Sequence, residues 1–177
     1  MTNNNVKLNS ALRDEAIRLG LCKQWQRDWK RDWDIDLLLD KYKEGIDFCI
    51  SNGYPSINFI KENFAKDDLR RHNILVDDKW SLLNPRTAVI QGNSTSTARY
   101  NGWTPGTIYI LNNSNAKVFA KNSSFVILHL FDNARVSCEA VDKAKIVVLR
   151  HSIKTIVEDC RGNAAVRDEI GYLDKKA

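Results

Sequence analysis

The strongest constraint on the fold is a short β-rich segment that recurs at nearly regular spacing in the second half of the chain. Each copy has a small or polar residue followed by alternating aliphatic residues. The copies are residues 116–120, 124–128, 134–138 and 144–148, which start eight, ten and ten residues apart. One such segment cannot bury its own apolar side, so the copies must stack. The repeat therefore predicts a short β-solenoid, and a small antiparallel β-sandwich, which has similar spacing, is the alternative.

Alternation within these segments separates inward from outward side chains. The residues expected to face inward are Ile108, Ile110, Val118, Ala120, Val126, Leu128, Val136, Cys138, Ile146 and Val148. Several of their outward neighbours are also apolar, which is unusual for a solvated strand face. We therefore expect Phe119, Ile127 and Phe131 to form an oligomer contact or a contact with the helical part of the chain.

The first half of the chain has the apolar spacing of helices. Trp25, Trp29 and Trp33 recur every four residues, which predicts that they lie along one side of a helix. A further helix is expected over about 34–51, and Ser56 is a candidate cap for the next one. The predicted fold is α+β, with a helical region at 1–73, a β-solenoid at 74–160, and a C-terminal helix and tail at 161–177. That last helix is expected from about 163 to 173.

The positive charge of the chain lies entirely in its second half. The formal net charge is +5; residues 1–79 carry 14 basic and 14 acidic residues, whereas residues 80–177 carry 13 and 8. A basic surface favours a polyanionic partner. The expected binding residues are a polar loop with cationic and aromatic groups and a row of basic strand residues. They are Arg99, Tyr100 and Trp103 in the loop, and Lys117, Lys121, Arg135 and Lys145 in the row. The alternative for the loop is that Tyr100 and Trp103 pack back onto the sheet.

The sequence contains no recognisable catalytic or cofactor motif. It has no GxSxG, no P-loop, no GxGxxG after a strand and no HExxH. The 3 His and 4 Cys residues show no metal-ligand spacing, so we expect no metal, no cofactor and no enzymatic activity. No apolar run reaches the ~18 to 20 residues of a membrane span, and a signal-peptide profile is missing, which predicts a cytoplasmic protein with no membrane partner.

Two phrases, LRDEAIRLGLCKQWQRDW and GIDFCISNGYPSINFIKENF, precede a β-repeat rich in NAKV and DNARV. Together they resemble a group of small uncharacterised proteins of Bacteroidetes genomes, their phages and mobile elements. The resemblance covers most of the chain and carries no assigned catalytic residues. It implies a genomic setting in which small proteins often bind host defence machinery.

These observations favour a non-enzymatic binding protein. The expected partner is a host defence protein or a ribonucleoprotein, with RNA or another nucleic acid contacted through the basic β-face. In the genomic setting above, such a protein would act as an anti-CRISPR-like inhibitor of host defence. The alternative is a self-associating structural or adaptor protein, a homo-oligomer held together by its outward apolar residues.

Overall fold

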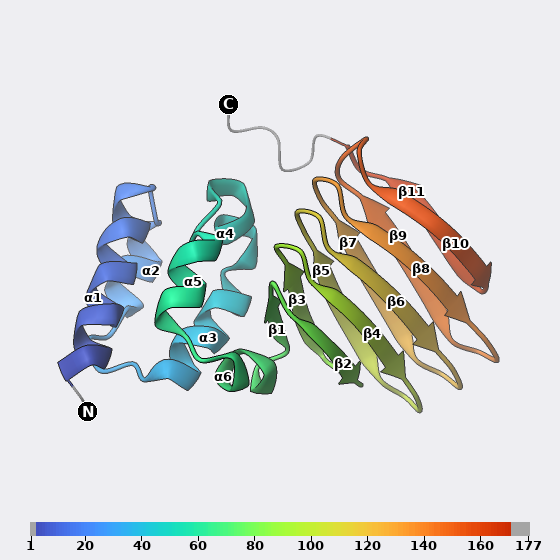
Figure 1. Ribbon diagram of the computed structural model, residues 1–177, viewed down its shortest axis with the longest axis horizontal. Coiled ribbons are helices and arrows are strands. Elements are labelled where there is room, and N and C mark those ends of the chain that lie inside the picture. Colours follow the sequence, from blue (N-terminus) through green and yellow to red (C-terminus); the bar gives the residue numbers. More distant parts are fainter. Residues whose placement is uncertain (1–2, 171–177) are drawn as a thin grey trace. The chain divides into compact units, whose positions relative to one another are not determined.

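The chain folds into two compact units, Met1–His72 and Asn73–Ala177 (Figure 1). The structure is a computed structural model that describes residues 3–170. The first unit is helical and the second consists of parallel β-strands stacked as a solenoid, so the fold is α+β. The predicted fold class is confirmed, and the antiparallel sandwich is excluded because the strand pairings in the described residues are parallel.

The helical unit contains six helices among its described residues. They are α1 (Asn3–Arg18), α2 (Lys23–Asp28), α3 (Ile35–Glu44), α4 (Ile46–Asn52), α5 (Ile57–Asn63) and α6 (Lys66–Arg71). Side chains cap two of them, since Asp34 accepts a hydrogen bond from the Leu37 amide and Ser56 accepts one from the Phe59 amide. The predicted Ser56 cap is thus confirmed. The helix expected over about 34–51 is divided at Gly45, the residue between α3 and α4.

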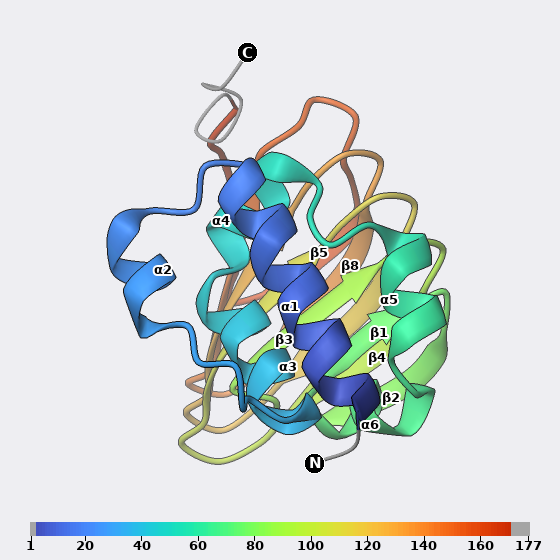
Figure 2. The ribbon, with the colours of Figure 1, turned by 90° about the vertical axis from the view of Figure 1, so that its left-hand side faces the viewer.

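The tryptophan series does not lie along one helix, because α2 ends at Asp28. Trp29 nevertheless stacks on Trp33, with ring centroids 5.1 Å apart. The buried amide of Asn9 in α1 holds the connecting segment, because it donates to the carbonyls of Lys30 and Trp33 and accepts from the Trp29 indole. Figure 2 shows α1 in front of the other helices of this unit. The predicted single helix is therefore wrong for this segment, whose backbone is held by hydrogen bonds to the buried Asn9 side chain.

The last helix of this unit is joined to α3 by ionic hydrogen bonds. His72 follows α6, is mostly buried, and places its two ring nitrogens 2.9 Å from Asp36 and 2.9 Å from Asp40, both in α3. The hydrogen bond from His72 holds the pKa of the Asp36 carboxyl below its usual range. These contacts connect α6, the helix before the first strand, to α3.

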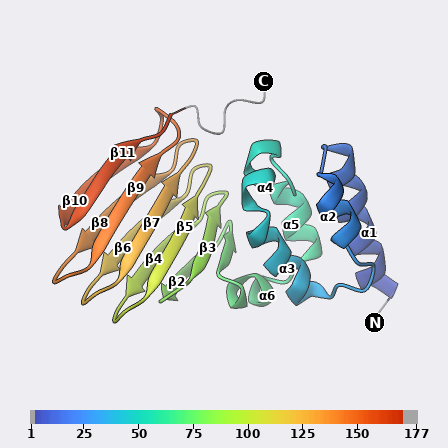
Figure 3. The same cartoon turned by 180° about the vertical axis from the view of Figure 1, so that it is seen from behind.

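The solenoid contains eleven strands within residues 73–170, the part of this unit that the structure describes. They are β1 (Ile74–Val76), β2 (Lys79–Leu83), β3 (Thr87–Gln91), β4 (Thr95–Tyr100), β5 (Pro105–Ile110), β6 (Asn115–Ala120), β7 (Phe125–Leu130), β8 (Arg135–Ala140), β9 (Lys145–Arg150), β10 (Ile156–Gly162) and β11 (Ala164–Asp168). Consecutive strands alternate between two sheets. Sheet A has the order β1-β3-β5-β7-β9-β11 and sheet B the order β10-β8-β6-β4-β2 (Figure 3).

The register shows that one coil spans twenty residues. Thr95 pairs with Asn115, and Asn115 pairs with Arg135; in sheet A, Phe125 pairs with Lys145. Each ten-residue segment of the sequence repeat is therefore half a coil, and its neighbours along the chain lie in the opposite sheet. Residues twenty apart, rather than ten apart, are the spatial neighbours.

Four corners of the described solenoid have an Asn or Asp with a positive φ angle in their second position. Asn112, Asn122, Asp132 and Asp142 occupy this position with φ between 53° and 60°, a conformation that Asn and Asp tolerate better than other residues with a side chain. Side chains link successive corners, since Asp132 accepts from the backbone amide of Asn112 at 2.9 Å and Asp142 from the backbone amide of Asn122 at 3.0 Å. These residues place each corner directly over its neighbour.

The ten side chains predicted to face inward all lie in the buried core between the two sheets. At one end of that core, the large ring of Tyr100 packs against Gly106, which has no side chain. Tyr100 is 1% exposed and its hydroxyl donates to the Pro85 carbonyl at 2.8 Å. Gly106 lies against the ring, and a Cβ added there would overlap it. Tyr100 is therefore a core residue.

The C-terminal helix expected from about 163 to 173 is not formed by its described part. Residues Ala164–Asp168 are strand β11, which pairs in parallel with β9. Gly162, with φ 66°, makes the corner before it. The strand ladder of β9 offers hydrogen-bonding partners to this segment, so the solenoid continues beyond residue 160. Residues 171–173 lie outside the described residues.

We expect Gly106→Ala to destabilise the solenoid by ~1–3 kcal/mol because the added methyl group overpacks the core against Tyr100. In a Tyr100→Leu background, the same substitution should cost less, because the smaller side chain leaves room for the methyl group. Urea unfolding of the wild type, both single variants and the double variant measures this coupling. Strictly additive losses would contradict the proposed packing.

Acidification should weaken the contact between α3 and α6. The pKa of Asp36 is lowered in the folded state, so its stabilising contribution is fully present above the ordinary value of 3.8 and is lost as the pH falls through the lowered value. We expect Asp36→Asn to melt earlier than the wild type at neutral pH and to lose less stability on acidification. Circular dichroism melts across this range test it. Asp14→Asn, at a carboxylate that is 77% exposed, is the matched control.

Candidate functional site

The outer face of sheet B carries a column of side chains at the ends of its strands. The register aligns Leu83 with Arg99, Arg99 with Phe119, and Phe119 with Glu139. The last three are each twenty residues apart, one per coil. These side chains point away from the core because they alternate with the buried residues Leu82, Ala98, Val118 and Cys138.

This column forms one side of a surface hollow of about 360 Å³, which we call the Phe119 groove. Corner residues that follow the strands form the other side. The groove is lined by Leu83, Arg99, Tyr100, Asn101, Phe119, Ala120, Lys121, Glu139 and Val141. Leu83 is 74% exposed and Phe119 is 39% exposed, so the groove offers apolar surface to solvent.

Cationic groups lie beside this apolar surface. The Arg99 guanidinium lies over the Phe119 ring, 5.7 Å from its centroid, in a cation–π contact that holds both side chains on the face. Lys121 is an exposed corner residue that lines the same groove. Of the lining residues only Glu139 is acidic, so the groove combines two positive charges, one negative charge and an accessible aromatic ring.

The structure brings part of the expected binding set together. Arg99, Phe119 and Lys121 meet in the Phe119 groove. Lys117 and Arg135 lie on neighbouring strands of the same sheet B face, where Lys117 pairs with Ser137 and Asn115 with Arg135. The basic residues of β4, β6 and β8 thus share one surface with the groove.

Trp103 lies on a corner next to the groove and is 89% exposed. Its corner stacks on the corner of Lys121, because the Ser123 amide donates to the Gly102 carbonyl at 3.1 Å. A large, almost fully exposed indole therefore lies on a corner that is hydrogen-bonded to the corner of the groove residue Lys121. Two separated aromatic surfaces are available to a partner here.

Three of the expected positions are corrected by the structure. Tyr100 faces inward, and burial raises the pKa of its phenol, so it lines the groove only from below. Lys145 lies on β9 in sheet A, so Lys117, Lys121, Arg135 and Lys145 do not form one stripe. Phe131 is 7% exposed and stacks on His151 with centroids 4.4 Å apart, which buries it within its own unit. Lys145 was assigned to the wrong sheet because ten residues were taken as a full coil. Tyr100 and Phe131 lie at or next to corners, where an outward direction was wrongly assigned.

Sequence reasoning missed Leu83, Asn101, Glu139 and Val141 as groove residues. The signal that finds Glu139 is the twenty-residue spacing after Arg99 and Phe119, which places all three in one column. Leu83 could not be found in that way, because two strands and two corners of the first coil are each one residue shorter, which reduces the spacing between Leu83 and Arg99 to sixteen residues.

The outer face of sheet A has a different character. Ile127 and Val147 are paired neighbours, as are His129 and Leu149, and all four side chains are partly exposed. Phe125 is 44% exposed beside them. Tyr109 stacks on His129 with centroids 4.8 Å apart, and Nδ1 of His129 lies 2.9 Å from Nε2 of His151. Sheet A therefore presents a mainly apolar surface that includes Ile127, and the role of Ile127 as a contact residue stays a prediction.

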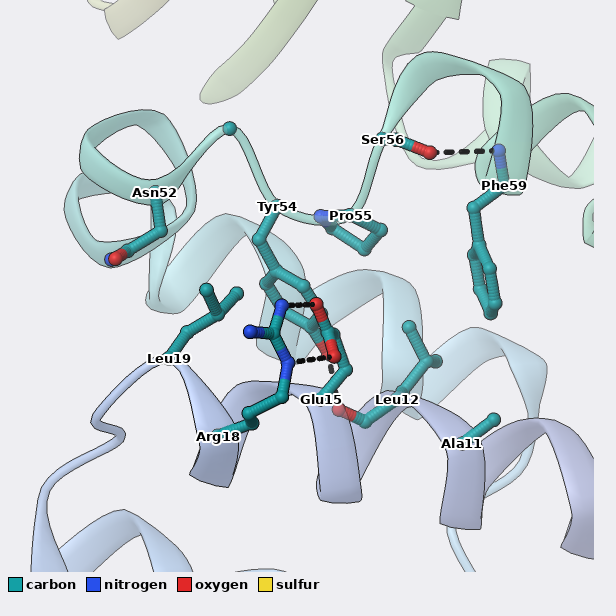
Figure 4. A pocket seen from close by; sticks show the side chains of 11 residues that line it. Ala11, Leu12, Glu15, Arg18, Leu19, Asn52, Tyr54, Pro55, Ser56 and Phe59 are labelled. Atoms are coloured by element: carbon teal, nitrogen blue, oxygen red, sulfur yellow. Dashed lines mark hydrogen bonds and ion pairs between the residues drawn. The ribbon is translucent and has the colours of Figure 1, made fainter.

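A second hollow, of about 390 Å³, lies within the helical unit (Figure 4). It is formed by α1 and the segment that joins α4 to α5. Arg18 and Glu15 border it in a two-point ion pair at 2.5 and 2.7 Å, and the hydrogen bond from Arg18 lowers the pKa of Glu15. Tyr54 donates its hydroxyl to the Leu12 carbonyl at 2.7 Å. Because these polar groups are bonded to one another, this hollow presents less free charge than the Phe119 groove.

Other site classes find little support. Within residues 3–170, no group of three or more His, Cys, Asp or Glu side chains is arranged to hold a metal ion. The same described residues include no helix that is long and apolar enough to cross a membrane. Comparisons with protein families, with curated proteins and with solved structures gave no match.

Proposed function

We propose that this protein is a non-enzymatic binding protein that takes single-stranded RNA, free or within a ribonucleoprotein, on the sheet B face. The observation that carries the proposal is the Arg99 guanidinium over the exposed Phe119 ring, beside Lys121 in one groove. Proteins that bind single strands combine a basic track for the phosphates with aromatic rings on which unpaired bases stack. The groove supplies both kinds of group within neighbouring coils.

The surroundings of the groove support the same partner. Lys117 and Arg135 extend the positive charge along β6 and β8, and the exposed Trp103 adds a second stacking surface at the corner. A double helix fits this site less well, because its bases are already stacked on one another and a flat sheet face does not enter its grooves. The proposal is therefore for unpaired nucleotides.

The biological role we propose rests on the sequence resemblance to proteins of phages and mobile elements. In that setting the ribonucleoprotein would belong to a host defence system, and this protein would act as an anti-CRISPR-like inhibitor by occupying it. The size of the chain and its basic solenoid suit such a stoichiometric blocker. This role depends on the binding activity, which is the part to test first.

Binding should depend on the groove residues and on salt. We expect Arg99→Glu combined with Lys121→Glu to weaken binding of a fluorescein-labelled single-stranded RNA at least tenfold in fluorescence anisotropy. Each lost phosphate contact lowers the slope of log affinity against log salt by about 0.7, so the double variant should lose about 1.4. Lys145→Glu, on sheet A, is the matched charge control and should bind almost normally.

A stacking variant separates aromatic from ionic recognition. Phe119→Leu keeps an apolar side chain of similar size but removes the ring, and base stacking is worth ~1–3 kcal/mol, or about 5- to 150-fold in affinity. Phe119→Trp should retain binding. Because the side chain lies on the surface, the melting temperatures of both variants should stay close to that of the wild type. Wild-type RNA binding that is independent of salt, or equal in all variants, would refute the proposal.

A second candidate function is self-association through sheet A. The observation that favours it is the cluster of partly exposed apolar side chains around Ile127, Val147 and Leu149, next to the exposed Phe125. Protein surfaces of this kind often mark interaction sites. In this case the protein would be an adaptor or structural component that presents its sheet B face on each copy of a homo-oligomer.

Light scattering tests the second candidate. We expect the wild type to be an oligomer and Ile127→Asp to be monomeric, since a carboxylate at the centre of an apolar contact would lose its hydration. Ser137→Asp, at the middle position of a strand in sheet B, is the matched control and should leave the oligomer intact. A wild type that is monomeric at high concentration would remove this candidate.

A further inference from the structure

Two cysteines face each other across the last strand pair of sheet B. Cys138 in β8 and Cys160 in β10 are register partners, and their Sγ atoms lie 3.6 Å apart. Cys138 is 4% exposed and belongs to the core, whereas Cys160 packs against that core and is partly exposed. Both are free thiols, as is the exposed Cys22 of the helical unit.

The positions of these residues suit a covalent bond. Paired residues of neighbouring strands have Cα atoms ~4.8 Å apart, within the ~4.4–6.8 Å that disulfides require. The two sulfur atoms have to approach by about 1.5 Å to reach the bond length of ~2.05 Å. Both side chains point into the same interior, so this approach needs no reversal of either strand.

Strand β10 is also placed to move by that amount. Among the described strands it is the last one of sheet B, and its only partner there is β8. Its register shifts between Val157 and Asp159, immediately before Cys160, so one residue bulges out of the ladder. By contrast, β8 is held between β6 and β10. The partner that has to move is thus the less constrained of the two.

We infer that Cys138 and Cys160 form a redox-active dithiol, which a low-molecular-weight disulfide such as oxidised glutathione converts to a disulfide that ties β10 to β8. The inference rests on the geometry of the last coils and is independent of the proposed RNA binding. It assigns a modification site to the interior side of β8 and β10, whereas the Phe119 groove uses the outer face of β8 at Glu139.

The reaction proceeds by two thiol–disulfide exchanges. The partly exposed Cys160 loses its proton, and its thiolate attacks one sulfur of oxidised glutathione; a protein–glutathione disulfide forms and one glutathione thiolate leaves. The Cys138 thiolate then attacks the Cys160 sulfur, so the mixed disulfide breaks and a second glutathione thiolate leaves. Two protein thiols are oxidised by two electrons, one glutathione disulfide is reduced, and the two protons pass to solvent or to the released thiolates.

The environment of Cys138 determines which step is slow. Burial, together with the hydrogen bond to Cys160, raises the pKa of the Cys138 thiol to about 12, so little of it is a thiolate at neutral pH. The second exchange should therefore accelerate as the pH rises. The neighbouring position of the two sulfurs offsets the small thiolate fraction, because the attack is intramolecular.

The experiment treats the full-length protein with oxidised glutathione at mildly alkaline pH, blocks remaining thiols, and maps tryptic peptides without reduction. Cleavage at Arg135, Lys143, Lys154 and Arg161 releases residues 136–143 and 155–161. We expect these two peptides joined, at the mass of their sum less two hydrogen atoms. The melting temperature of the oxidised solenoid should exceed that of the reduced one by several degrees, because the bond restricts the unfolded chain.

Two variants complete the test. Cys22→Ser should leave the joined peptides unchanged, whereas Cys138→Ser should stop the reaction at the mixed disulfide, with glutathione retained on Cys160. Circular dichroism verifies that both variants fold. A wild type that keeps both thiols under conditions that modify Cys22, or that retains glutathione on Cys160 without forming the joined peptides, would overturn the inference.

Discussion

The solenoid depends on the hydrogen-bonded stacking of its corners. Several corners reverse the chain at an Asn or Asp with positive φ, and some of these side chains accept from the backbone of the neighbouring coil, as Asp132 does from Asn112. This hydrogen bond satisfies a backbone N–H group that would otherwise lack a partner, and it fixes the orientation of the residue with positive φ. Because the corners are aligned, the strands between them pair so that each residue lies next to the residue twenty positions farther along the chain.

That register is what creates the candidate site. Arg99, Phe119 and Glu139 are distant along the chain, yet the ladder places them side by side on one face. A side chain on a strand inside a ladder has few orientations open to it, so the cation–π contact between Arg99 and Phe119 is held by rigid elements rather than by a loop. A pre-organised basic and aromatic surface loses little entropy when a flexible strand of nucleic acid binds to it.

The Phe119 groove and the thiol pair use different sides of sheet B. The groove lies on the outer face of β2, β4, β6 and β8, whereas Cys138 and Cys160 face the interior at β8 and β10, and β10 pairs only with β8 among the described strands. Strands at a sheet edge open more readily than those inside, so a thiol pair is better placed to react at this end. A disulfide there would tie the last two strands of sheet B together on the side opposite to Glu139, the residue of β8 that lines the groove.

The alternation of small and aliphatic residues determined by itself that strands from Ile108 to Val148 stack around an apolar interior, because each half coil has to bury the same side. The helical first half and the boundary near residue 73 also follow from local apolar spacing and turn residues.

The local pattern could not determine which copies of the repeat are neighbours in space. A ten-residue period is compatible with one strand per coil or with two, and only the pairing of strands in space decides between them. Lys145 was for that reason assigned to the wrong face, and the expected C-terminal helix proved to be strand β11, because β9 offers a ladder that the segment alone does not contain. Likewise, the polar segment around Tyr100 left two alternatives, a surface stacking group or a ring packed back onto the sheet. The tertiary structure decides for packing, because it places the large ring against Gly106, six residues farther along, where there is no side chain.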